Sequence, residues 1–277
     1  MKGASLSIAF NRPDHFQRSF ESLLRAANSS ALFKVVVFQT GDPNTERVID
    51  HFKPAIDRLI CVDGSSKSVQ ENINFNRFHG YRVLFDELGY DWVLGVEDDV
   101  QVAFDAITFT QEMFDRYSSC ARFRGVNLGS FERKSPELNF TYSLLRYGLH
   151  GQAGAIGLRT WEHIRRWEID SCSTDGWDGL IEGYLKTGFM ATPNTSRFLD
   201  EGWIGTHTPS NQSDPYYTSL AASFMGTDEY LIGEYVQRDV LHSLRKDAVI
   251  YKKFNWFEYQ LRNFKRYLQI QRISSQK

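Results

Sequence analysis

The chain has 277 residues, of which 42% are hydrophobic, so it can bury a large core in one domain, with or without an appended subdomain. Its formal net charge of −2 gives no electrostatic reason to expect nucleic acid as a partner. The three cysteines lack metal-ligand spacing and favour a reducing compartment. Because no apolar run resembles a signal peptide or a membrane span, we expect a cytoplasmic protein without a transmembrane segment.

The N-terminal half alternates predicted strands with predicted helices. Short apolar runs predict strands at 6–10, 34–39, 58–62 and 92–96. Helices are expected between them, at 16–27, 45–52 and 76–88. Such alternation predicts a parallel, doubly wound α/β sheet, in which ligands bind outside the carboxyl ends of the strands.

The second half has a looser pattern. A helix is expected over 105–117 and a strand over 123–128. A glycine-rich stretch at 148–157 allows close approach of the backbone, and another helix is expected over 160–167. A loop rich in Ser, Asp and Gly follows, and it leads into Trp177-Asp178.

Three consecutive carboxylates, Glu97, Asp98 and Asp99, directly follow the strand expected at 92–96. Adjacent buried carboxylates repel each other, and alternation along the strand forces at least one of them across the sheet edge. In one interpretation, one or two of them cap the next element and the others are solvated. In the other, they face a divalent cation and a diphosphate, because Mg²⁺ and Mn²⁺ favour carboxylates plus substrate phosphates.

The absence of two sequence motifs argues against two classes of phosphate-handling enzyme. No GxxxxGK[ST] loop is present, which argues against an NTPase, and the turn at 11–14 lacks the DxD of an aspartate-based phosphatase. A sugar-nucleotide transferase needs a first strand-to-helix turn, a mid-chain acid cluster and a later carboxylate, and all three are present. A sugar-1-phosphate nucleotidyltransferase, which normally has a basic Gly-rich loop, and a non-catalytic sugar-binding module are the alternatives.

Five segments resemble, in order, the N-acetylglucosaminyltransferase I-like family. They are SIAFNRPDHFQRSFESLL at 7–24, VEDDVQV at 96–102, GQAGAIGLRTW at 151–161, Trp177-Asp178, and Pro193-Asn194-Thr195-Ser196-Arg197 with the later Gly205-Thr206-His207. Together they span roughly three quarters of the chain, from Ser7 to Thr208. After Trp177-Asp178 the family continues with Trp-Met-Arg, whereas this chain has Leu180-Ile181-Glu182. The sugar and the acceptor are therefore left open.

The resemblance implies an α/β fold of the GT-A (Rossmann-like) type, which binds nucleotide sugars on a mostly parallel central sheet. It places a catalytic domain at 1–215, with a donor half at 1–104 and an acceptor half at 105–215, and a helical C-terminal extension at 216–277. The implied activity is that of a metal-dependent, inverting glycosyltransferase. A UDP-sugar would be the donor, and a hydroxyl of a glycan or lipid-linked glycan the acceptor.

The resemblance also implies roles for individual carboxylates. Asp99 would bind Mn²⁺ or Mg²⁺, which neutralises the leaving diphosphate, and His207 would join it or touch the diphosphate. Asp178 would be the base that takes the acceptor proton, because the neighbouring Trp177 could raise the pKa of its carboxylate. Asp175 is the second candidate for this base. The alternatives are an N-cap role for Asp178 and an inert loop histidine at 207.

The donor-binding candidates, of which the resemblance implies Asp42, Glu97 and Asp98, follow the first four predicted strands, together with one later arginine. They are Asn11, Arg12, Asp42, Asp63, Arg77, Arg82, Glu97, Asp98 and Arg197. Arg197 is a phosphate-clamp candidate because a guanidinium can bind phosphate through two hydrogen bonds. For Arg12, a plain surface position is the alternative.

The segment 251–277 combines basic and aromatic residues. It contains seven Lys or Arg residues and one acid, and Phe257, Leu261, Phe264 and Leu268 form an apolar stripe at helical spacing. One interpretation is a helix packed on the catalytic domain. The other is an interfacial helix that holds the enzyme peripherally against anionic lipid, where a lipid-linked acceptor would be found.

Overall fold

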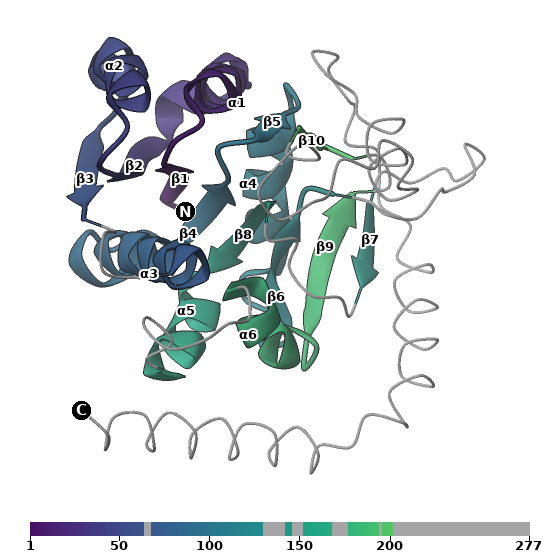
Figure 1. Ribbon diagram of the computed structural model, residues 1–277. Coiled ribbons are helices and arrows are strands. Elements are labelled where there is room, and N and C mark those ends of the chain that lie inside the picture. Colours follow the sequence, from purple (N-terminus) through teal and green to yellow (C-terminus); the bar gives the residue numbers. More distant parts are fainter. Residues whose placement is uncertain (64–67, 130–141, 146–151, 168–176, 194–195, 202–277) are drawn as a thin grey trace, which may run out of the picture.

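An eight-stranded sheet forms the centre of the molecule (Figure 1). The computed structural model describes residues 1–63, 68–129, 142–145, 152–167, 177–193 and 196–201. The strand order is β3-β2-β1-β4-β8-β6-β9-β7. The strands are β1 (Gly3–Ala9), β2 (Phe33–Gln39), β3 (Arg58–Val62), β4 (Trp92–Val96), β6 (Phe123–Asn127), β7 (Tyr142–Leu145), β8 (Ala153–Gly157) and β9 (Phe189–Pro193).

Six of these strands run in one direction. β3, β2, β1 and β4 are parallel neighbours, as the alternating pattern predicts, and β6 pairs in parallel with β9. β8 runs the opposite way between β4 and β6, and β7 runs the opposite way at the edge. The fold class is therefore α/β with a mostly parallel sheet, as expected. β8 was expected only as a glycine-rich stretch, because its alanines and glycines carry little strand signal.

Helices cover both faces of the sheet (Figure 1). One layer contains α1 (Pro13–Arg25), α2 (Pro43–Phe52) and α4 (Ala106–Tyr117), and the other contains α3 (Val69–Arg82), α5 (Leu158–Ile164) and α6 (Trp177–Leu185). Short turns follow several of them: η1 (Ser29–Ala31), η2 (Lys53–Ala55), the π-turn η3 (Val83–Glu87) and η4 (Arg165–Trp167). Each layer buries its own hydrophobic cluster against the sheet. The sheet is thus a fixed platform for the residues at its edges.

α3 begins earlier than the sequence pattern predicts. The expected start was residue 76, whereas the helix starts at Val69, with Ser68 and Glu71 forming a capping box. Asn72, Asn74 and Asn76 are buried although they are polar. These residues break the apolar periodicity, which is why the first two turns of the helix look like a polar loop in the sequence.

A second, two-stranded sheet pairs β5 (Val100–Val102) with β10 (Phe198–Asp200) in antiparallel register. Neither strand was expected. The predicted boundary at residue 215 and the helical extension at 216–277 lie outside the described residues. Within the part of the chain that the structure describes, no helix is both long and apolar enough to cross a membrane.

Candidate functional site

The carboxyl ends of β1 and β4 bring two chain segments together. These strands are parallel neighbours, with Ser7 opposite Val96. The turn that carries Asn11 and Arg12 therefore lies at the same sheet edge as the acids at 97–99. This is the edge at which α/β sheets bind their ligands.

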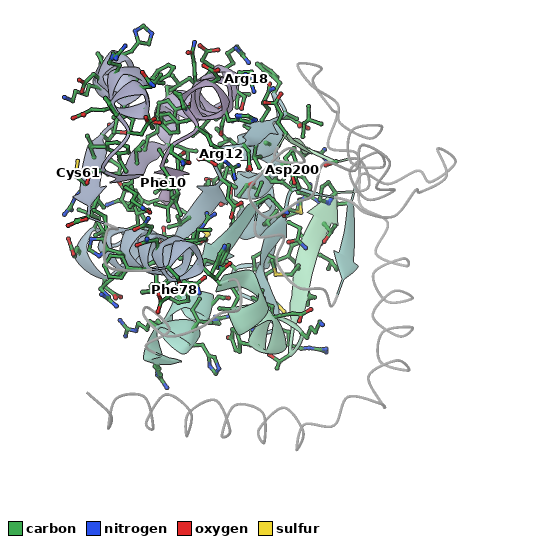
Figure 2. The ribbon with its side chains drawn as sticks, in the orientation of Figure 1. Phe10, Arg12, Arg18, Cys61, Phe78 and Asp200 are labelled. Carbon is green, nitrogen blue, oxygen red and sulfur yellow. The ribbon has the colours of Figure 1, made fainter. Side chains whose placement is uncertain are left out.

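Arg12, labelled in Figure 2, carries the first positive charge beside the acid cluster. Its guanidinium forms an ion pair with Asp99, and Nη1 lies 3.7 Å from Oδ1 of Asp98. Burial lowers the pKa of Arg12, but the charges of Asp98 and Asp99 raise it by more, so this residue is a permanent cation. The arginine expected to contact the donor thus already compensates two of the acids.

Arg77 on α3 is the second positive charge. Its Nη2 donates to Oε1 of Glu97 at 3.2 Å, and the side chain is completely buried. Glu97 itself is 30% exposed. Two guanidinium groups therefore stand against three carboxylates, which explains how this edge tolerates Glu97, Asp98 and Asp99.

After these ion pairs form, Asp98 can still bind a proton and Asp99 can still accept a ligand. Burial, reinforced by the charge of Asp99, raises the pKa of Asp98 to about 7. Oδ1 of Asp99 is buried and has no hydrogen-bond partner among the described residues. An ionised oxygen in that position favours an incoming cation or hydrogen-bond donor.

Buried serines of α1 fix the backbone of the acid-bearing segment. The hydroxyl of Ser19 donates to the carbonyl of Glu97 at 3.0 Å. The amide of Val102 donates to the hydroxyl of Ser22 at 2.9 Å. Because both ends of the segment are held, the carboxylates project from a defined main chain.

β10 adds residues that the sequence did not indicate. Asp200, labelled in Figure 2, is buried, and it pairs with Val100, the residue after the acid cluster. The amide of Glu201 donates to the carbonyl of Asp99 at 2.8 Å, and its carboxylate accepts from Arg18 on α1, also at 2.8 Å. This pairing joins positions about one hundred residues apart, so no local signal could have revealed it.

The remaining donor candidates from the first half are spread along the same edge and beyond it. Asp42 caps α2, accepting from the amide of Thr45 at 2.9 Å. Asn11 and Asp63 are exposed after β1 and β3. Arg82 is exposed on the last turn of α3. Their contacts with a donor stay predictions.

Arg197 is completely buried beneath the site. Its Nε donates to Asp105 at 3.1 Å, and its guanidinium lies 4.3 Å from the ring centre of Phe109. Its carbonyl accepts from the amide of Ala103 at 2.8 Å, which joins the two halves of the domain. The predicted phosphate-binding role of Arg197 stays a prediction, and in this structure its partners are Asp105 and Phe109.

The candidate base lies on the first turn of a helix. α6 begins at Trp177, so Asp178 is its second residue and stands within the helix, not in front of it. Trp177 is buried, and Arg77 lies 4.8 Å from the centre of its ring. The side chain of Asp178, and both Asp175 and His207, lie outside what the structure describes.

A divalent cation fits the acid cluster in one respect. Oδ1 of Asp99 is a buried carboxylate oxygen without a hydrogen-bond partner among the described residues, and Asp98 is adjacent. Those described residues contain no group of three or more His, Cys, Asp or Glu that could hold an ion by itself. The cluster thus suits the type of site in which one or two protein carboxylates share a cation with substrate phosphates.

The comparison with known proteins bears on the fold. No protein-family model matches this chain, and no curated protein matches it. The chain is similar to residues 1–349 of S. aureus TarS, with a TM-score of 0.50 and 10% identity, covering 83% of this chain and 67% of that one. For the UDP complex of the same TarS fragment, the TM-score is 0.50 and the identity 10%, and the match covers 72% of this chain and 60% of that one. For the mannosyltransferase PcManGT from Pyrobaculum calidifontis, in complex with GDP-Man and Mn²⁺, the TM-score is 0.47 and the identity 12%. The match covers 69% of this chain and 54% of that one.

This chain thus spans between about half and two thirds of the solved chains it matches. At 10% identity, the likeness to TarS establishes the fold alone. The GT-A fold expected from the sequence is confirmed by that likeness and by the observed strand order.

Proposed function

We propose that this chain is a metal-dependent, inverting glycosyltransferase related to the N-acetylglucosaminyltransferase I-like family. The donor is a nucleoside-diphosphate sugar, with UDP as the carrier, and the acceptor is a hydroxyl of a glycan or glycolipid. The observation that carries this proposal is the acid cluster at the carboxyl edge of a GT-A sheet, in which Oδ1 of Asp99 is buried without a hydrogen-bond partner among the described residues.

The positive groups that the donor diphosphate would meet at this edge are Arg12 and the start of α1. Arg12 stands immediately before α1, which begins at Pro13. Its charge and the N-terminal end of the helix dipole both favour an anion. Asp99, with His207 from the later segment, would hold Mn²⁺ or Mg²⁺. When bound, the metal supplies Lewis-acid stabilisation of the diphosphate as it leaves.

Asp178 would serve as the single base. The acceptor oxygen forms a bond to the anomeric carbon while the bond from that carbon to the phosphate oxygen breaks. The nucleoside diphosphate leaves with the electron pair, and the hydroxyl proton goes to Asp178. A single displacement, in which the acceptor attacks opposite the leaving diphosphate, inverts the anomeric configuration. Glu97 and Asp98 would hold hydroxyls of the donor sugar and ribose.

The experiment is an incubation of the protein with a panel of nucleotide sugars, with and without Mn²⁺, in which released nucleotide is measured. We expect release that depends on Mn²⁺ and is highest with a UDP-sugar. NMR of the product then reports the anomeric configuration. Retained configuration would disprove the role of Asp178 as a single base, and no release with any donor would disprove the proposed function.

A further inference from the structure

Arg77 joins the acid cluster to the start of α6. Its guanidinium donates to Glu97 at 3.2 Å on one side and lies 4.8 Å from the ring centre of Trp177 on the other. Trp177 is buried and is followed directly by the candidate base, Asp178. One buried side chain therefore touches both the donor-side acid and the residue next to the acceptor-side base.

The backbone of β4 is shaped for this arginine. A Cβ atom on Gly95 would lie 2.3 Å from Nη1 of Arg77 and 2.9 Å from the hydroxyl of Tyr81. The ring of Tyr81 packs edge-on against Trp177, with centroids 5.8 Å apart. The guanidinium is thus enclosed by β4, by its own helix α3 and by α6.

The cost of this arrangement indicates a role beyond folding. A completely buried guanidinium is expensive to desolvate, and a well-packed apolar side chain in its place often gives equal or greater stability. The contact with Glu97 holds one carboxylate oxygen, and this side chain, 30% exposed, follows β4 at the edge where α/β sheets bind ligands. Because Arg77 itself has no exposed surface, it would act on a donor through Glu97, which is partly exposed.

We propose that Arg77 is a positioning residue: it fixes the carboxylate of Glu97 and ties it to Trp177 at the start of the helix that carries the candidate base. The catalytic consequence rests on the proposed glycosyltransferase function. The physical link between Glu97 and Trp177 does not, so the two can fail separately.

The link is tested without turnover by fluorine NMR. The full chain is labelled with 5-fluorotryptophan, and the resonance of residue 177 is assigned by its loss in Trp177→Phe. We expect Glu97→Gln to shift this resonance, because it changes the charge on the other side of Arg77. Glu87→Gln is the matched control: Glu87 pairs with Arg58 at the same 3.2 Å, but both side chains are exposed. It should leave the resonance unmoved.

The positioning role is tested by kinetics. Arg77→Met should lower kcat by about 10-fold to 100-fold while the affinity for UDP stays within about threefold. In the Glu97→Gln background the same change should cost less than about threefold, because the partner through which Arg77 acts is already altered. Arg58→Met, on the exposed pair, should leave kcat unchanged.

The outcomes separate cleanly. If Glu97→Gln does not shift the Trp177 resonance, the link between Glu97 and Trp177 is disproved, even if Arg77→Met does not fold. Additive losses of kcat in the two backgrounds would reduce Arg77 to a structural residue. If the wild-type chain transfers no sugar but its resonance responds to Glu97→Gln, the proposed function fails and the link stands.

Discussion

Asp99 is the residue on which the proposed metal chemistry depends, and the structure indicates what its loss would do. Asp99→Asn removes one of three neighbouring carboxylates, and Arg12 keeps Asp98 as a partner. We therefore expect the free energy of unfolding to change by less than about 1 kcal/mol. Turnover that requires Mn²⁺ should be lost, because the amide oxygen is a poor substitute for an ionised ligand.

Asp115→Asn is the control for this variant, since Asp115 lies on α4 and accepts from Gln111 at 2.8 Å, on the surface. Thermal melts and released nucleotide would be measured for both variants. Wild-type turnover in Asp99→Asn would remove Asp99 from the metal site.

Asp98 predicts a pH dependence of stability in the metal-free protein. Burial and the charge of Asp99 raise its pKa to about 7, well above the unfolded value near 4. Between these two values the folded protein binds more protons than the unfolded chain. The stabilisation is therefore complete below about pH 4 and is lost as the pH rises through 7, by on the order of 2 kcal/mol between pH 5 and 8.

Urea titrations at several pH values would measure this slope, and Asp98→Asn should flatten it. A slope that is the same in the variant and the wild type would mean that another group is responsible.

Residue types in a pattern revealed the acids but not their counter-charges. Glu97, Asp98 and Asp99 follow an apolar run, so their place at a strand end could be predicted. Arg77 and Arg197 were expected to line the donor pocket, but the structure buries them against Glu97 and Asp105, at separations of 20 and 92 residues. Such pairings depend on tertiary packing, to which a local pattern is blind.

At the scale of elements, Asp42 tests whether a helix cap is also a ligand contact. Its side chain accepts from the amide and the hydroxyl of Thr45 at the start of α2. Asp42→Ala should lower the melting temperature by about 2–4 °C, whereas Asp42→Asn should preserve the cap. Thermal melts would measure both variants.

Ser68→Ala, which removes the cap of α3, is the comparison for a second cap in the same fold. Calorimetric titration of Asp42→Asn with UDP then examines the predicted donor contact. Intact stability with weaker binding would support that contact, and an unchanged melting temperature in Asp42→Ala would contradict the capping role.

Gly95 tests the fit between β4 and α3. Because an added Cβ would lie 2.3 Å from Arg77, Gly95→Ala must displace the buried guanidinium. We expect destabilisation of about 1–3 kcal/mol, with a smaller loss in the Arg77→Met background. Chemical denaturation of the four proteins of this cycle would measure both values. Equal losses in the two backgrounds would show that Arg77 is not the obstacle.

The elements themselves were predictable where the apolar period was clear. β3 and β4 match the expected strands at 58–62 and 92–96, and α4 differs from the expected helix by one residue. β8 and β10 were missed because a strand of small residues and a strand of three residues show almost no alternation of apolar and polar residues. These missed strands are the ones that connect the second half of the chain to the acid cluster.

At the scale of the whole molecule, one sheet unites the expected donor and acceptor halves. β4 from the first half pairs with β8 from the second, and β10 returns to β5 beside the acids. The carboxyl ends of β1 and β4 and the β5–β10 pair gather the charged residues at one edge of the sheet. A membrane-linked acceptor would have to be presented toward this edge.

The segment 251–277 is the candidate for such presentation, and its sequence alone supports the prediction because it lies outside the described residues. Seven basic residues and one acid accompany the apolar stripe from Phe257 to Leu268. Each basic residue near an anionic surface contributes about 1 kcal/mol, so several give reversible binding. The full chain should sediment with phosphatidylserine vesicles at low salt, less at high salt, and not with neutral vesicles. Changing Lys252, Lys253, Lys265 and Arg266 to Gln should abolish sedimentation while leaving the melting temperature unchanged. If the wild-type chain stays in the supernatant with anionic vesicles at low salt, the segment does not hold the enzyme at a membrane.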